Sequence, residues 1–136
     1  MKGAYILVIY ISNNFNSKIG ALGKILFKKG FYFYVGSALG NKGSSTLINR
    51  VRRHLLSPKL KKNHWHIDYL LANNEANVIR IYLFPIMRKI ECKIAIALEK
   101  TADSYINKFG SSDCNCKSHL FYYEEFKELN EFLTFF

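Results

Sequence analysis

The sequence has few prolines, few cysteines and, over its first two thirds, almost no acidic residues. Two of its 136 residues are proline, and no tract has low complexity, which argues against a linker or a disordered tail. The longest apolar runs, residues 4–11 and 78–85, fall short of the ~18 residues that a membrane-spanning helix needs. We therefore expect no membrane partner. The hydrophobic fraction of 49% suffices for one packed domain.

The sequence has few cysteines, and their number is odd. Cys92, Cys114 and Cys116 are the three cysteines, and the apolar run that follows Met1 ends without a cleavage site for secretion. An odd cysteine count in a chain without a signal is typical of a reducing compartment. This pattern predicts a cytoplasmic location.

Acidic residues are nearly missing before residue 91. Residues 1–90 hold fifteen Lys and Arg against two Asp and Glu, whereas residues 91–136 hold five against eight. Seven basic residues and no acid lie between Lys42 and Lys62. A localised basic excess attracts a polyanion, most often nucleic acid. We predict a nucleic-acid partner, the alternative being a basic surface without one.

The hydrophobic pattern predicts a small α+β domain. Apolar, β-branched and aromatic residues predict strands over 3–12, 31–36 and 78–84, and Gly20 and Gly23 predict a hairpin between the first two.

Helical spacing predicts helices over three further segments. They are residues 45–56, capped by Ser44 or Ser45, residues 64–72, and a segment from about 87–90 to 106. We divide the chain into a domain over 1–122 and an amphipathic C-terminal helix over 123–136. That helix carries Phe126, Leu129, Leu133 and Phe136 at helical spacing. We expect it to pack on its own domain, the alternative being a second copy in a homodimer.

Two of the predicted helices carry charged residues at informative positions. On the helix over 45–56, Arg50 and His54 border the apolar face formed by Leu47, Ile48, Val51 and Leu55. Arg53 points away from this face into solvent, as a solvated or phosphate-binding residue would. In the first turn of the next long helix, Glu91 lies within the apolar stripe. A carboxylate there needs a metal ion, an arginine or the helix N-terminus as a partner. The alternatives without a role in catalysis are a surface arginine for Arg50 and a helix-capping carboxylate for Glu91.

Several of these residues together resemble a nuclease superfamily. The resemblance rests on four features in order: Gly3-Ala4-Tyr5, Tyr34-Val35-Gly36, the string from Leu47 through Arg50 to His54, and a helix with Glu91. With these features, the chain resembles the GIY-YIG nucleases over about residues 3–106. The segments Tyr34–Ala38, His64–Leu70 and Ser112–Tyr122 resemble a mainly archaeal branch of that superfamily. The resemblance implies a mostly antiparallel sheet flanked by helices. The long gap between the two tripeptides implies an inserted hairpin.

The resemblance also implies an activity: hydrolysis of DNA phosphodiester bonds with one Mg²⁺ or Mn²⁺, in DNA repair or processing. Glu91 would hold the ion, and Arg50 would stabilise charge on the phosphate. Tyr5 or Tyr34 would orient or deprotonate the attacking water, with a pKa lowered by Arg50 or the ion. His54 would contact phosphate or support the site. The superfamily's Pro-x-x-Asn pattern is not visible after Glu91. Its absence favours the alternative of a nucleic-acid-binding module that has lost turnover.

Further residues are candidates for binding nucleic acid. Basic side chains that can contact phosphate are Arg52, Arg53, Lys61 and Lys62. His64 and His66, with Trp65 between them, could contact phosphate or stack on a base.

A Cys/His string offers a second candidate site. Cys114-x-Cys116-x-x-His119 has the spacing of metal ligands, and Cys92 could complete a tetrahedral zinc set. His64 or His66 could complete the set in place of Cys92. Such a string is only moderately specific, so we expect free buried thiols and no bound zinc. A structural zinc is one alternative. A disulfide between Cys92 and either Cys114 or Cys116 is the other.

Overall fold

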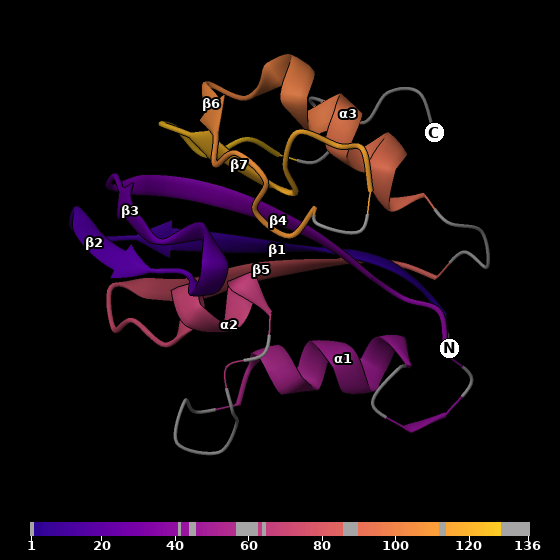
Figure 1. The fold of residues 1–136 in the computed structure, drawn as a ribbon. Coiled ribbons are helices and arrows are strands. Elements are labelled where there is room, and N and C mark those ends of the chain that lie inside the picture. The colour runs from indigo at the N-terminus through magenta and orange to yellow at the C-terminus, as the bar shows by residue number, and fades with distance from the viewer. Residues whose placement is uncertain are drawn as a thin grey trace.

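A five-stranded antiparallel sheet forms the centre of the domain (Figure 1). The computed structural model describes residues 2–40, 42–43, 46–56, 63, 65–85, 90–111 and 114–128. The strand order is β5-β1-β4-β7-β6. The strands are β1 (Gly3–Ile11), β4 (Gly30–Ala38), β5 (Ala76–Phe84), β6 (Ser104–Tyr105) and β7 (Leu120–Tyr123). The predicted α+β class is thereby confirmed.

Helices cover both faces of this sheet, and each face has its own hydrophobic core (Figure 1). On one face lie α1 (Leu47–His54), α2 (His66–Leu71) and a hairpin of β2 (Phe15–Lys18) and β3 (Lys24–Phe27). The 3₁₀ turn Gly20–Leu22 joins β2 to β3, as the two glycines predicted. On the other face lies α3 (Glu91–Thr101). Burial on both faces explains why β1 is apolar almost throughout.

The sheet narrows on one side of β4. Strand β7 pairs with β4 from Phe31 to Tyr34, where Tyr34 lies opposite Leu120. One residue further, the Val35 N–H donates to the His119 carbonyl oxygen at 2.9 Å. Within the described residues, no strand pairs with this edge of β4 beyond that bond. On this side, the second half of β4 is therefore an edge without a described partner strand.

Two helices differ from their predicted bounds. Helix α1 is capped by Thr46, whose hydroxyl accepts from the Asn49 N–H at 3.3 Å, whereas Ser44 and Ser45 lie outside the described residues. Leu55 follows the end of α1 and is 56% exposed, so its predicted place on the apolar face is wrong. Helix α3 ends at Thr101 rather than near 106, because Ser104 and Tyr105 pair with β7. No helix in the described part of the chain has the length and apolar character to cross a membrane.

The C-terminal segment also departs from its prediction. Tyr123 belongs to β7, and residues 124–128 are not helical, so a helix beginning at 123 is wrong. Cross-strand pairing with β4 and burial of Tyr123 outweigh the helical spacing here. Phe126 packs edge-on against Phe31, and Glu128 pairs with Arg80 at 3.0 Å, so these residues lie against the domain. Leu129, Leu133 and Phe136 lie outside the described residues.

Candidate active site

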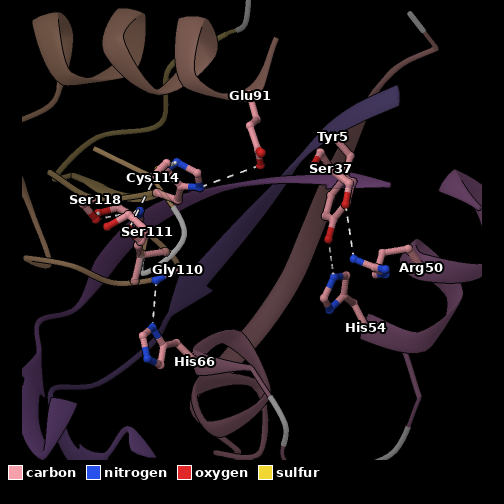
Figure 2. A network of polar contacts seen from close by, with 12 residues as sticks. Tyr5, Ser37, Arg50, His54, His66, Glu91, Gly110, Ser111, Cys114 and Ser118 are labelled. Carbon is pink, nitrogen blue, oxygen red and sulfur yellow. Dashed lines mark hydrogen bonds and ion pairs between the residues drawn. The ribbon is translucent and has the colours of Figure 1, made fainter. Parts of the chain in front are cut away.

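A cavity of about 370 Å³ opens where the sheet narrows. Its lining falls into two groups (Figure 2). The tyrosine wall comes from β1, β4 and α1 and consists of Tyr5, Tyr34, Ser37 and Arg50. The cysteine wall comes from the start of α3 and the segment before β7 and consists of Glu91, Cys92, Cys114 and His119. Residues from positions 5 to 119 thus meet in one place.

Tyr5 is held on the tyrosine wall by a glycine and a histidine. It lies opposite Gly36 in the β1–β4 register, and a Cβ on Gly36 would come within 2.4 Å of the Tyr5 ring. Only glycine therefore leaves room for the ring. The Tyr5 hydroxyl lies 2.6 Å from His54 Nε2, and both side chains are buried. His54 stands behind Tyr5 and supports it, one of the two roles expected for it.

Burial sets the protonation of both tyrosines. It raises the pKa of Tyr5 well above the usual value, and a neighbouring Tyr34 adds to the effect. Burial also raises the pKa of Tyr34, with Glu91 contributing. Arg50 lowers both pKa values, but by less than burial raises them. The expected lowering by Arg50 is therefore present but is outweighed by burial, and both hydroxyls are protonated at neutral pH.

Arg50 lines the cavity, and its guanidinium is held there by a hydrogen bond and a cation–π contact. Its Nη1 donates to the Ser37 carbonyl oxygen at 3.2 Å, and its guanidinium carbon lies 4.6 Å from the centre of the Trp65 ring. These contacts fix the direction of a charge that can face an anion.

Arg53 is structural rather than solvated. It forms a double hydrogen bond with Asp68, at 2.7 and 3.0 Å, and the Asp68 side chain is fully buried. Asp68 also accepts from the Trp65 N–H at 2.9 Å, so it caps α2 while it binds α1. The prediction that Arg53 points into solvent is wrong, because the buried carboxylate attracts its guanidinium inward.

Glu91 is the first residue of α3 and faces the cavity rather than the core. Its side chain is 24% exposed, and its Oε2 lies 4.0 Å from His119 Nδ1 (Figure 2). Of the described residues in the lining, Glu91 is the one carboxylate. Its oxygens can therefore serve a cation or a polar ligand there.

Next to Glu91, three thiols and an imidazole converge. The ligand atoms of Cys92, Cys114, Cys116 and His119 all lie within 4.8 Å of one another, a group that could hold a metal ion. The three cysteines are free thiols, without the disulfide that sequence allowed. Burial raises the pKa of the Cys92 and Cys116 thiols, and burial lowers the pKa of His119. Cys92, Cys116 and His119 are therefore mainly neutral at pH 7.

The structure describes only some of the residues predicted to bind nucleic acid. Arg52 is exposed on α1. Lys61, Lys62 and His64 lie outside the described residues. His66 faces inward, and its Nδ1 accepts the Gly110 N–H at 2.8 Å. Burial lowers the pKa of His66, so the neutral ring supports the loop rather than contacting phosphate.

Sequence reasoning gave no role in the site to Trp65, Asp68 or Ser37. Trp65 and Asp68 lie in the string His64–Leu70, whose unusual mixture of aromatic and charged residues was the available signal. Ser37 contributes through its backbone oxygen, for which a sequence carries no signal.

One comparison with known proteins gives a result. The sequence profile of a family described as a domain of unknown function, DUF123, matches residues 4–135. The chain belongs to this family. The match includes both walls of the cavity. No curated protein and no solved structure is similar enough to match.

Proposed function

We propose that this DUF123 domain is a metal-dependent endonuclease of the GIY-YIG type, which hydrolyses phosphodiester bonds in DNA during repair or processing. One observation carries the proposal. Tyr5, Tyr34, Arg50 and Glu91, which the sequence resemblance selects from separate segments, line the same cavity. A set of unrelated packing residues has no reason to converge in this way.

Arg50 would bind the scissile phosphate. Its guanidinium faces the cavity with its direction set by Ser37 and Trp65. A planar guanidinium can donate two hydrogen bonds to a phosphate and stabilise the charge that builds on its oxygens during attack. No large reorganisation of Arg50 is needed at that moment.

Tyr5 and His54 would handle the proton of the attacking water. Because the Tyr5 hydroxyl is protonated, it cannot act as a base by itself. His54 Nε2, at 2.6 Å, can accept the tyrosine proton while the tyrosine oxygen accepts one from water. Hydroxide then attacks phosphorus and the bond from phosphorus to the leaving oxygen breaks. The leaving oxygen takes up a proton from solvent, and His54 returns its proton to solvent. Tyr34, which lies with Tyr5 on the tyrosine wall, would help to orient the water.

Glu91 fits a hard divalent ion. Mg²⁺ prefers oxygen ligands and keeps several waters, so one partly exposed carboxylate in an open cavity suits it or Mn²⁺. When bound, such an ion supplies positive charge to a phosphate oxygen and to the leaving group.

The basic charge of one segment supports DNA as the substrate. Exposed Arg52 and the basic residues Lys61 and Lys62 belong to the segment over 42–62 that has seven bases and no acid. Replacing these three by alanine should flatten the salt dependence of DNA binding by about 0.9 in log–log slope per lost phosphate contact. Arg53 is left intact because it holds Asp68. An unchanged slope would show that this segment does not touch DNA.

A second candidate function is binding without turnover. The deep burial of both tyrosines favours it, because a hydroxyl with a raised pKa is a poor base.

A cleavage screen separates the two. Labelled hairpin, flap, mismatched and single-stranded DNA would be incubated with Mg²⁺ or Mn²⁺ and with the wild type, Glu91→Gln or Glu99→Gln. Glu99 lies on the same helix, pairs with Lys117 at 3.4 Å and does not line the cavity. We expect wild type and Glu99→Gln to cut, and Glu91→Gln to bind DNA without cutting. If Glu91→Gln cuts as fast as wild type, the proposed site is wrong. Binding without cleavage by wild type would favour the second candidate.

A further inference from the structure

The cysteine wall contains the elements of a second metal site that the proposed chemistry does not use. Cys92 comes from the first turn of α3, whereas Cys114, Cys116 and His119 come from the segment that precedes β7. Two segments that are distant in sequence thus bring four ligand atoms within 4.8 Å of one another. We propose that these four side chains bind one Zn²⁺ tetrahedrally, and that the zinc fixes Glu91 at the edge of the cavity.

The distances are close to those of a tetrahedral site. Zinc binds sulfur at about 2.3 Å and imidazole nitrogen at about 2.0–2.1 Å, which puts neighbouring ligands about 3.5–3.8 Å apart. Cys114 Sγ already lies 3.4 Å from His119 Nε2. The largest separation, 4.8 Å, has to close by on the order of 1 Å, which a thiol achieves by rotating about its side-chain bond.

His119 has the orientation of a metal ligand. Its Nε2 faces Cys114, while its Nδ1 lies 4.0 Å from Glu91 Oε2. Ligating histidines are commonly held in this way, with the second nitrogen directed at a carbonyl or a carboxylate. The ring is buried, so its direction is fixed by packing.

The donor set selects the metal. Three thiolates and an imidazole are soft ligands that suit Zn²⁺ and suit Mg²⁺ poorly. Four protein ligands also complete the zinc coordination sphere, which is the pattern of a structural site rather than a catalytic one. The two metals are therefore expected to divide between neighbouring positions: zinc at the thiols, and the oxygen-seeking ion at Glu91.

A zinc at this position would tie the loop to the helix. The segment between β6 and β7 is held by scattered backbone bonds, such as Lys108 N–H to the Lys117 oxygen at 2.7 Å and His119 N–H to the Phe109 oxygen at 2.8 Å. Zinc would add a bond from this loop to Cys92, the neighbour of Glu91. The positioning of Glu91 rests on the proposed function, whereas zinc binding does not.

Metal analysis of the purified full chain tests the binding. Wild type, Cys114→Ser, His119→Gln and His66→Gln would be produced with added zinc, and their zinc content measured. His66 is the matched control, because it contacts the same loop through Gly110 but lies outside the cluster. We expect about one zinc per chain in wild type and His66→Gln, and less in the other two. Replacement by Co²⁺ should give the sulfur-to-cobalt absorption of a tetrahedral thiolate site. No zinc and no cobalt spectrum in wild type, or a disulfide among the three cysteines found by mass spectrometry, would overturn the proposal.

Magnesium dependence tests the positioning. In Cys114→Ser, the Mg²⁺ concentration that gives half-maximal cleavage should rise, because Glu91 is less well placed, while His66→Gln should match wild type. An equal Mg²⁺ requirement in all three proteins would remove the link between zinc and Glu91. If wild type binds zinc but cuts no DNA, the proposed function fails and the zinc site stands. If wild type cuts DNA but binds no zinc, the proposed zinc site is wrong and the proposed function stands.

Discussion

On the tyrosine wall, every side chain comes from a strand or a helix, whereas on the cysteine wall Cys114 and His119 come from an irregular segment. Backbone pairing of β1 with β4 and packing of α1 on both strands fix the first group. The second group has fewer backbone bonds and a concentration of metal-ligating side chains. The difference indicates that the fold itself organises one wall, while the other is suited to organisation by a bound ion.

The largest expected effect tests whether the tyrosine wall depends on the fold alone. Asp68→Asn removes the charge that holds Arg53, and breaking a buried ion pair costs about 3–5 kcal/mol. The free energy of unfolding, measured with urea, should fall by that amount with or without zinc. The matched control is Glu128→Gln, whose pair with Arg80 is exposed, and its loss should stay below about 1 kcal/mol. Equal losses in both variants would contradict the structural role of Asp68.

The next prediction concerns the charge on the same wall. Arg50→Lys keeps the charge but loses the planar donor, so the cleavage rate should fall about 10²–10³-fold. Arg80→Lys, in the exposed pair with Glu128 and away from the cavity, should cut at the wild-type rate. Rates under single-turnover conditions check this. A wild-type rate for Arg50→Lys would remove Arg50 from the mechanism.

A smaller effect is expected from Gly36→Ala. The added methyl group would meet the Tyr5 ring at 2.4 Å, so the ring must move away from His54. Overpacking of this kind costs about 1–3 kcal/mol. Denaturation should show that loss, whereas Ser37→Ala, at the next residue, should lose less. A fully stable Gly36→Ala protein would mean that Tyr5 has another place to pack.

The smallest effect concerns the loop behind the cysteine wall. Burial lowers the pKa of His66, so protonation favours the unfolded chain. The stability that neutral His66 contributes is present above the unfolded pKa of about 6.5 and is lost as pH falls through the lower folded value. The unfolding free energy of wild type should therefore fall more steeply below about pH 6.5 than that of His66→Gln. Parallel curves would show that the bond to Gly110 does not depend on this proton.

The sequence predicted the tyrosine wall better than the cysteine wall. Continuous apolar runs identify β1 and β4, which carry Tyr5 and Tyr34, as observed. Strands β6 and β7 are too short, at two and four residues, for a pattern to be visible. Without them, the sequence could not show that the segment with Cys114 returns to the start of α3.

Contacts between residues on different helices were the other feature that the sequence could not predict. Arg53 and Asp68 are fifteen residues apart and lie on different helices. Helical projection treats each helix separately, so it assigned Arg53 to solvent. It nevertheless singled out Arg50 at the border of an apolar face and Glu91 within an apolar stripe, and both residues line the cavity, although Glu91 does not face the core.

The short length of β7 has a consequence for cooperativity. The sheet separates the two hydrophobic cores of the domain, and past the end of β7 the layer of α1 and the layer of α3 both face the same cavity. A molecule bound there contacts both layers at once, so it is released when either layer opens locally. Its binding energy therefore opposes both openings. Occupancy of the cavity would therefore couple the stability of one core to that of the other.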